Sequence, residues 1–63
     1  MHKLYNMTGR EYKEKTKHLK QSYIAQSINV TQAYLSRILT ERTPLTKKME
    51  ILLNQFLKNN NLN

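Results

Sequence analysis

The amino-acid sequence predicts an all-α domain of four or five helices, and three observations lead to this fold class. Apolar residues recur at spacings of three and four positions, the period of helices packed on a core. No segment alternates apolar and polar residues strongly enough to predict a strand. The 63 residues contain neither an internal repeat nor a Gly- or Ser-rich linker. A chain of this length forms one domain, so residues 1–63 are expected to fold as a single unit.

The first predicted helix spans Gly9–Leu19. Thr8 and Glu11 have the spacing of a capping box, in which each side chain accepts a hydrogen bond from the other residue's backbone N–H. Met7 can pack on Tyr12 across this cap. The side chains expected to face the core from this part of the chain are those of Tyr5, Tyr12, Thr16 and Leu19.

A neighbouring side of the same helix is basic. On a helical wheel this basic stripe carries Arg10, Lys13, Lys17 and Lys20. Glu11 and Glu14 are expected to lie away from it. Lys13 and Lys17 would repel each other at a separation of four positions, and a phosphate backbone would relieve that cost. The alternative is a solvated surface in a Lys-rich chain.

Two short helices joined by a tight turn are predicted within residues 21–39. Ala25 is small and lies between the apolar Ile24 and Ile28, so a second helix can cross closely at this point. Asn29 follows at the position where the first of these helices must end. A left-handed backbone there suits Gly best and Asn next, which predicts the turn.

The second of these helices follows the turn directly. Val30 is expected to fill the corner, and the Thr31 hydroxyl can cap the helix that begins after it. Leu35, Ile38 and Leu39 recur at helical spacing and are expected to face the core. The opposite side of the helix and its flanks carry Gln32, Ala33, Ser36, Arg37 and Thr40.

This segment resembles the helix-turn-helix of the Cro/C1-type (XRE) family of phage and bacterial DNA-binding proteins. The family motif runs Gln, two variable residues, an apolar residue, Ala, three residues, Gly, Val, Ser or Thr, and Gln. The matching positions here are Gln21, Ile24, Ala25, Asn29, Val30, Thr31 and Gln32. The resemblance covers about residues 10–57 and implies a compact lambda-repressor-like fold. The run VTQAYLSRIL also looks like the recognition helix of the LacI family, but that family's hinge segment is not evident.

The chain departs from the family motif at two positions. Asn29 replaces the usual Gly, a change that a left-handed turn tolerates. Lys20 stands where the family prefers Ser, Thr or Asn as the cap of the first motif helix, so it is a poor cap for a helix starting at Gln21.

The resemblance implies a surface that reads DNA in the major groove. Gln32 is the candidate for a bidentate contact to adenine, and Ala33 for contact with a thymine methyl group. Arg37 can pair with guanine or with a phosphate. The residues expected to read bases are Gln32, Ala33, Ser36 and Arg37. The residues expected to contact the DNA backbone are Gln21, Thr31, Tyr34, Thr40, Arg42, Lys13, Lys17 and Lys20, with core packing as the alternative role of Tyr34.

A last helix is predicted near Pro44, with either Thr43 or Thr46 as its cap. Its core-facing stripe consists of Leu45, Met49, Leu52, Leu53 and Phe56. Leu57 extends this stripe beyond the needs of a small core, which predicts a dimer surface. Lys58–Asn63 has little helix propensity and is expected to fray, with a flexible tail over about residues 59–63.

Composition favours a binding protein over an enzyme. Eleven Lys and Arg residues against four acidic residues give a formal charge of +7, which favours a polyanionic partner. Cys is absent, and His2 and His18 have no further ligands at metal-binding spacing. The chain has a single Gly, so it lacks a Gly-rich phosphate loop. We therefore expect no catalytic site, metal, cofactor or small-molecule ligand.

The sequence has no apolar segment of membrane-spanning length and no signal-peptide core, which predicts a cytoplasmic protein. The expected function is sequence-specific binding of double-stranded DNA by a homodimer, as a transcriptional regulator and most simply a repressor. The alternative is a helix-turn-helix domain that binds a protein partner. The charge also permits RNA binding, although no sheet with exposed aromatic residues is predicted.

Overall fold

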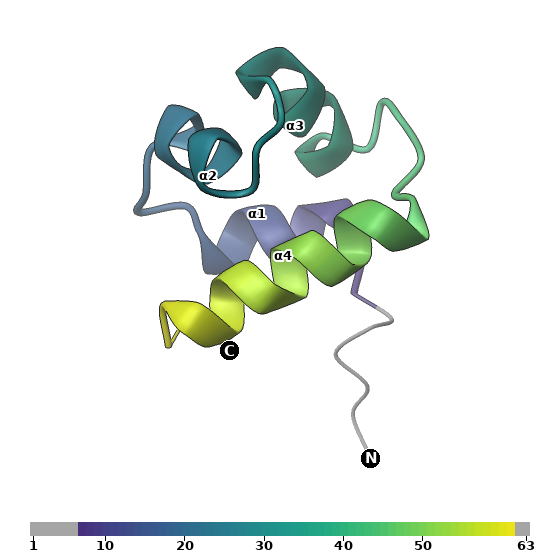
Figure 1. Cartoon of the computed structure of the whole chain (residues 1–63). Coiled ribbons are helices and arrows are strands. Elements are labelled where there is room, and N and C mark those ends of the chain that lie inside the picture. The colour runs from purple at the N-terminus through teal and green to yellow at the C-terminus, as the bar shows by residue number, and fades with distance from the viewer. Residues whose placement is uncertain (1–6, 62–63) are drawn as a thin grey trace.

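The computed structural model describes residues 7–61 and contains four helices, with no strand among these residues (Figure 1). The helices are α1 (Gly9–Lys15), α2 (Gln21–Ser27), α3 (Gln32–Leu39) and α4 (Lys47–Asn59). In Figure 1, α2 and α3 lie on one side of α1 and α4. The all-α prediction is confirmed. Tyr5 and His2, named in the sequence analysis, lie outside the described residues.

The predicted capping box starts α1. The Glu11 N–H donates to Thr8 Oγ1 at 3.2 Å, and the Thr8 N–H donates to Glu11 Oε1 at 2.8 Å. Met7 and Tyr12 are both buried in the core, as expected of residues that pack across the cap.

The end of α1 differs from the prediction, because the helix stops at Lys15 rather than at Leu19. The buried Thr16 donates its hydroxyl hydrogen to the Tyr12 carbonyl at 2.9 Å, a bond that favours departure from regular helix. The chain then turns, and the Leu19 N–H donates to the Thr16 carbonyl at 2.9 Å. Leu19 still packs against the core, so its inward position is confirmed although its helical state is not.

The turn between α2 and α3 forms at Asn29, as predicted. Asn29 has a φ of 63°, in the left-handed region. The Val30 N–H donates to the Ala25 carbonyl at 2.9 Å, and the Asn29 N–H donates to the Gln26 carbonyl at 3.3 Å. This pair of bonds is a Schellman motif, which satisfies carbonyl groups at the end of α2. At the other end of α2, Lys20 is the N-cap and its side chain makes no capping bond.

α3 begins at its predicted cap and ends in a second Schellman motif. Thr31 Oγ1 accepts a hydrogen bond from the Tyr34 N–H at 3.1 Å. After α3, Glu41 has a φ of 64°, and the Arg42 N–H donates to the Arg37 carbonyl at 2.9 Å. Gly is the usual residue at this left-handed position, so the sequence contains no signal for the motif.

The N-cap of α4 is Thr46, one of the two predicted alternatives. Thr46 Oγ1 accepts from the Met49 N–H at 3.1 Å, and the helix begins at Lys47, three residues after Pro44. The core that α4 completes consists of Met7, Tyr12, Ile24, Ala25, Ile28, Leu35, Ile38, Leu39, Met49, Leu53, Phe56 and Leu57.

The predicted surface role of Leu57 is wrong. Its side chain is 3% exposed and belongs to the monomer core. The helix also continues through Asn59, past the point at which fraying is expected. Asn60 Nδ2 donates to the Phe56 carbonyl at 2.8 Å, which supplies an end cap that helix propensity alone does not predict. Residues 62–63 of the expected tail lie outside the described residues.

Candidate nucleic-acid interface

The outward side of α3 carries the side chains expected to read bases. Gln32, Ala33 and Arg37 are exposed, and Ser36 is half-buried. On the opposite side, Leu35 and Ile38 are completely buried, and Leu39 is nearly so. The helix is thus amphipathic in the register that the spacing predicts, with Gln32, Ala33 and Arg37 exposed on its outward side.

The position of α3 depends on a close backbone approach to α1. A Cβ atom placed on Gly9 would collide with the carbonyl oxygen of Ile38, so only glycine allows the two backbones to approach this closely. Beside this contact, the Arg10 N–H donates to Glu41 Oε2 at 3.2 Å. These contacts join the last turn of α3 to the first turn of α1.

The residues near the starts of α2 and α3 that are expected to contact the DNA backbone differ in their exposure. Lys20 and Thr31 are exposed, whereas Gln21 is half-buried. Tyr34 is half-buried and packs against the core, which agrees with the alternative of core packing for this residue. The Thr31 oxygen accepts a hydrogen bond as the α3 cap, and this bond leaves its own hydroxyl hydrogen free to donate.

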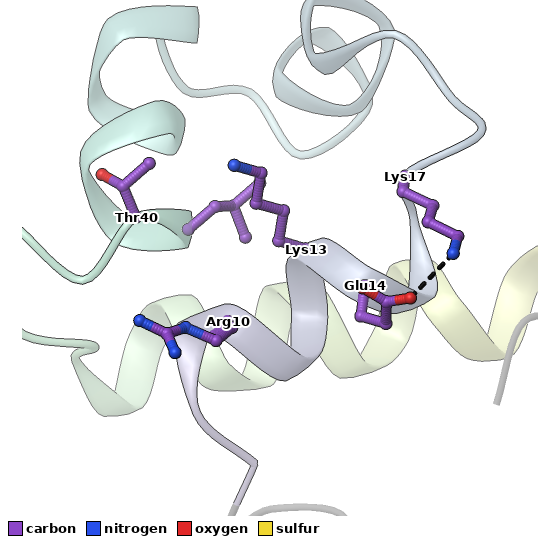
Figure 2. Close-up of a pocket in the computed structure, with 6 residues that line it drawn as sticks. Arg10, Lys13, Glu14, Lys17 and Thr40 are labelled. Carbon is purple, nitrogen blue, oxygen red and sulfur yellow. Dashed lines mark hydrogen bonds and ion pairs between the residues drawn. The ribbon is translucent and has the colours of Figure 1, made fainter.

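Three other candidate residues lie together at a hollow between α1 and the end of α3 (Figure 2). The hollow has a volume of about 400 Å³. Its lining includes the predicted backbone contacts Lys13, Lys17 and Thr40, together with Arg10, Glu14 and Leu39. Lys20, the fourth member of the basic stripe, does not line it. Arg10 was predicted to belong to the basic stripe, but it was not among the residues expected to contact the DNA backbone.

The expectation that Glu14 lies away from the basic stripe is wrong. Lys17 Nζ donates to Glu14 Oε2 at 2.8 Å, as Figure 2 shows, and both residues line the hollow. The bond from Lys17, together with its positive charge, lowers the pKa of Glu14, and the same contact raises the pKa of Lys17. Lys13 and Lys17 do not lie on one helix as predicted, because α1 ends at Lys15.

Thr40 is less available to a phosphate than its exposure suggests. Its hydroxyl donates to the Ser36 carbonyl at 2.8 Å, so the hydroxyl hydrogen is used within the last turn of α3. Arg42 lies two residues further on and is exposed. Its backbone N–H closes the Schellman motif, and its side chain therefore projects from a hydrogen-bonded turn.

Glu41 is the residue of this region that sequence reasoning missed. Its carboxylate accepts a hydrogen bond from the Arg10 N–H, and a bond between residues 31 positions apart leaves no signal in the local sequence. Tyr23, on α2, is 48% exposed. Its ring meets Phe56 edge-on, with ring centroids 6.0 Å apart.

Residues 7–61 contain no group of three or more His, Cys, Asp or Glu side chains that could hold a metal ion. None of the helices in this range is long and apolar enough to cross a membrane. Comparison of the chain with protein-family models, curated proteins and solved structures finds no match.

Proposed function

We propose that this chain is a Cro/C1-type helix-turn-helix regulator that binds specific sequences of double-stranded DNA through α3. The observation that carries the proposal is the exposed row of Gln32, Ala33 and Arg37, opposite the buried Leu35 and Ile38. An α-helix fits the major groove, which is about 12 Å wide, and side chains on its outward side then reach the base edges.

The chemistry of this row suits base recognition. The Gln32 amide can donate to adenine N7 and accept from adenine N6, and the Ala33 methyl group can contact a thymine methyl. Both residues lie in the first turn of α3, the end of a recognition helix that approaches the bases. Arg37 is one turn further along, where it can pair with guanine or with a phosphate.

The net charge of +7 supports the same proposal, because it attracts a polyanion before any specific contact forms. Lys20 and Arg42 are exposed beside α2 and α3, where they can contact phosphates on either side of the groove. The proposed protein is a repressor that acts in the bacterial cytoplasm, by occupying its DNA site without a metal, cofactor or catalytic step.

We further propose that two copies bind together, each α3 in a major groove one helical turn, or about 34 Å, from the other. Because Leu57 is buried, a dimer contact must use other apolar side chains. The large apolar side chains exposed on residues 7–61 are Tyr23 and Ile51, each 48% exposed. Ile51 lies on the outer side of α4 and is the candidate contact between copies.

Selection of bound duplexes from random DNA, followed by sequencing, tests the proposal. A recurring sequence is expected, and two inverted half-sites would support the dimer. Gln32→Ala should then lower the preference for the selected duplex over random DNA by about tenfold, since a good bidentate base contact contributes about 1–3 kcal/mol. Gln55→Ala, an exposed Gln on α4, is the matched control and should leave the preference unchanged.

Two outcomes would contradict the proposal. A Gln32→Ala variant with an unchanged preference would remove the base-reading assignment. Absence of duplex binding, together with a protein complex that hardly responds to salt, would favour the alternative of a helix-turn-helix domain that binds a protein partner. Phosphate-dominated binding should instead weaken steeply as salt rises.

A further inference from the structure

The hollow between α1 and the end of α3 holds more positive than negative charge. Arg10, Lys13 and Lys17 contribute three positive charges and Glu14 one negative charge, for a net charge of +2 among its lining residues. Glu41 also lies near the first turn of α1, but it lines a separate hollow with Met7 and Pro44.

The cations of the hollow are not equivalent. Lys17 is paired with Glu14 at 2.8 Å, whereas neither Arg10 nor Lys13 forms an ion pair with any residue in the range 7–61. Arg10 and Lys13 are also both exposed. In Figure 2, Lys13 and Arg10 lie on the side of the hollow where Thr40 is, and the Glu14–Lys17 pair lies on the other side.

The end of α3 does not use these cations either. The carbonyl groups of three residues in its last turns already accept hydrogen bonds from the chain that follows: Ser36 from Thr40, Arg37 from Arg42 and Thr43, and Ile38 from Glu41. A basic side chain often satisfies such carbonyls at a helix end. Because backbone N–H groups and a hydroxyl do so here, Arg10 and Lys13 remain available to an external anion.

We infer that this hollow binds one phosphodiester of the DNA backbone, with Arg10 and Lys13 as its cationic ligands. This inference rests on the proposed function and specifies one phosphate contact within it. The hollow adjoins the last turn of α3, which also carries the exposed Arg37, so a strand bordering the groove that α3 enters would pass close to it. Lys17 contributes less than Lys13, because Glu14 already neutralises it.

The test uses the selected duplex with single methylphosphonates, each of which replaces one charged phosphate with a neutral group. For the wild-type protein, there should be one phosphate in each half-site that the hollow binds, and neutralising it should weaken binding severalfold. For Lys13→Ala, a methylphosphonate at that same position should cause little further loss of affinity. At the other sensitive positions, the loss should be as large as for the wild-type protein. Arg10→Ala should behave in the same way.

Lys58→Ala provides a matched control, because it removes one exposed positive charge from α4, away from the hollow. Lys13→Ala should also reduce the slope of log K against log salt by about 0.9 for each copy bound, or about 1.8 for the proposed dimer, because each copy loses one phosphate contact, and Lys58→Ala should not. Circular dichroism of both variants verifies that they fold.

A separate arm distinguishes a DNA phosphate from a free phosphate. Inorganic phosphate is titrated at constant ionic strength while the backbone amides of Arg10 and Lys13 are followed by NMR. Suppose that the chemical shifts of these amides change saturably with phosphate, and that Lys13→Ala alters the effect of no methylphosphonate. This result would overturn the inference in favour of a site for free anions. If the wild-type protein selects no duplex at all, the proposed function itself fails. If it selects one and Lys13→Ala leaves every methylphosphonate effect unchanged, only the present inference fails.

Discussion

The carboxylate of Glu41 accepts a hydrogen bond from the backbone N–H of Arg10 at 3.2 Å, although 31 positions separate the two residues. Glu41 has a φ of 64°, a conformation that costs a non-glycine residue about 1–2 kcal/mol. Its carboxylate lies at the first turn of α1, where a negative charge is favourable. The same residue thus ends α3 and stabilises the start of α1.

Substitutions of Glu41 should separate these two effects. Glu41→Ala keeps the unfavourable φ and loses the carboxylate, so it should lower the free energy of unfolding by about 1 kcal/mol. Glu41→Gly also loses the carboxylate but relieves the backbone strain, and it should be about 1 kcal/mol more stable than Glu41→Ala. Urea unfolding of the three proteins measures the order. Equal stability of the Ala and Gly variants would contradict the backbone explanation.

Gly9→Ala should destabilise the protein, although alanine ordinarily favours a helix over glycine by about 1 kcal/mol. The added Cβ would collide with the Ile38 carbonyl, so α1 and α3 would have to separate at their closest contact. A loss of about 1–3 kcal/mol is expected, as for other overpacked sites. Gln26→Ala, on the exposed side of α2, should change stability by less than about 0.5 kcal/mol. A Gly9→Ala protein as stable as the parent would disprove the close approach.

Tyr12→Phe should make stability less dependent on alkaline pH. Tyr12 is 0% exposed and donates to Asn54 Oδ1 at 2.6 Å. Burial, with a smaller contribution from the charge of Glu50, raises the pKa of the Tyr12 hydroxyl. Because the folded state holds this proton more tightly than the unfolded state, stability should fall as pH rises above about 10, the ordinary tyrosine value.

The measurement for Tyr12 is the free energy of unfolding in urea at about pH 9 and pH 11, two values on either side of the ordinary tyrosine pKa. All other groups are the same in the two proteins, so the difference between parent and Tyr12→Phe isolates the phenol. At neutral pH the variant should lose about 1 kcal/mol with the hydrogen bond to Asn54. If the free energy of unfolding changed with pH equally in the two proteins, the raised pKa of Tyr12 would be ruled out.

Glu14→Gln should tighten DNA binding severalfold, and equally for selected and random duplexes. The substitution frees Lys17 from its ion pair at 2.8 Å and removes a negative charge from the hollow beside α1. Contacts to phosphates carry no sequence information, so affinity should rise without a change in preference. Fluorescence anisotropy at several salt concentrations measures both quantities. Glu50→Gln changes the net charge equally from α4, and an equal gain there would show that only total charge matters.

Local signals in the chain were sufficient for several features of the fold. Thr8 and Thr31 cap helices at the predicted positions, Thr46 is one of the two caps predicted for α4, and Asn29 makes the predicted left-handed turn. Each of these depends on residues within about four positions, so short-range hydrogen bonding explains them. The alternation of buried and exposed positions on α3 is equally local, which is why helical spacing alone predicts that Gln32 lies on the outward side.

Other features required contacts between distant segments. The apolar residues of α4 recur at helical spacing through Leu57, but this spacing does not show whether Leu57 is buried. Leu57 is buried because it packs in the core with residues of the other helices. α1 ends early because Thr16 is packed in the core and bonds to the Tyr12 carbonyl. The hollow likewise exists because Gly9 lets α1 approach α3, which brings Arg10 and Lys13 beside Thr40. Periodicity assigns a side chain to one side of a helix, whereas tertiary packing decides which surface, if any, that side meets.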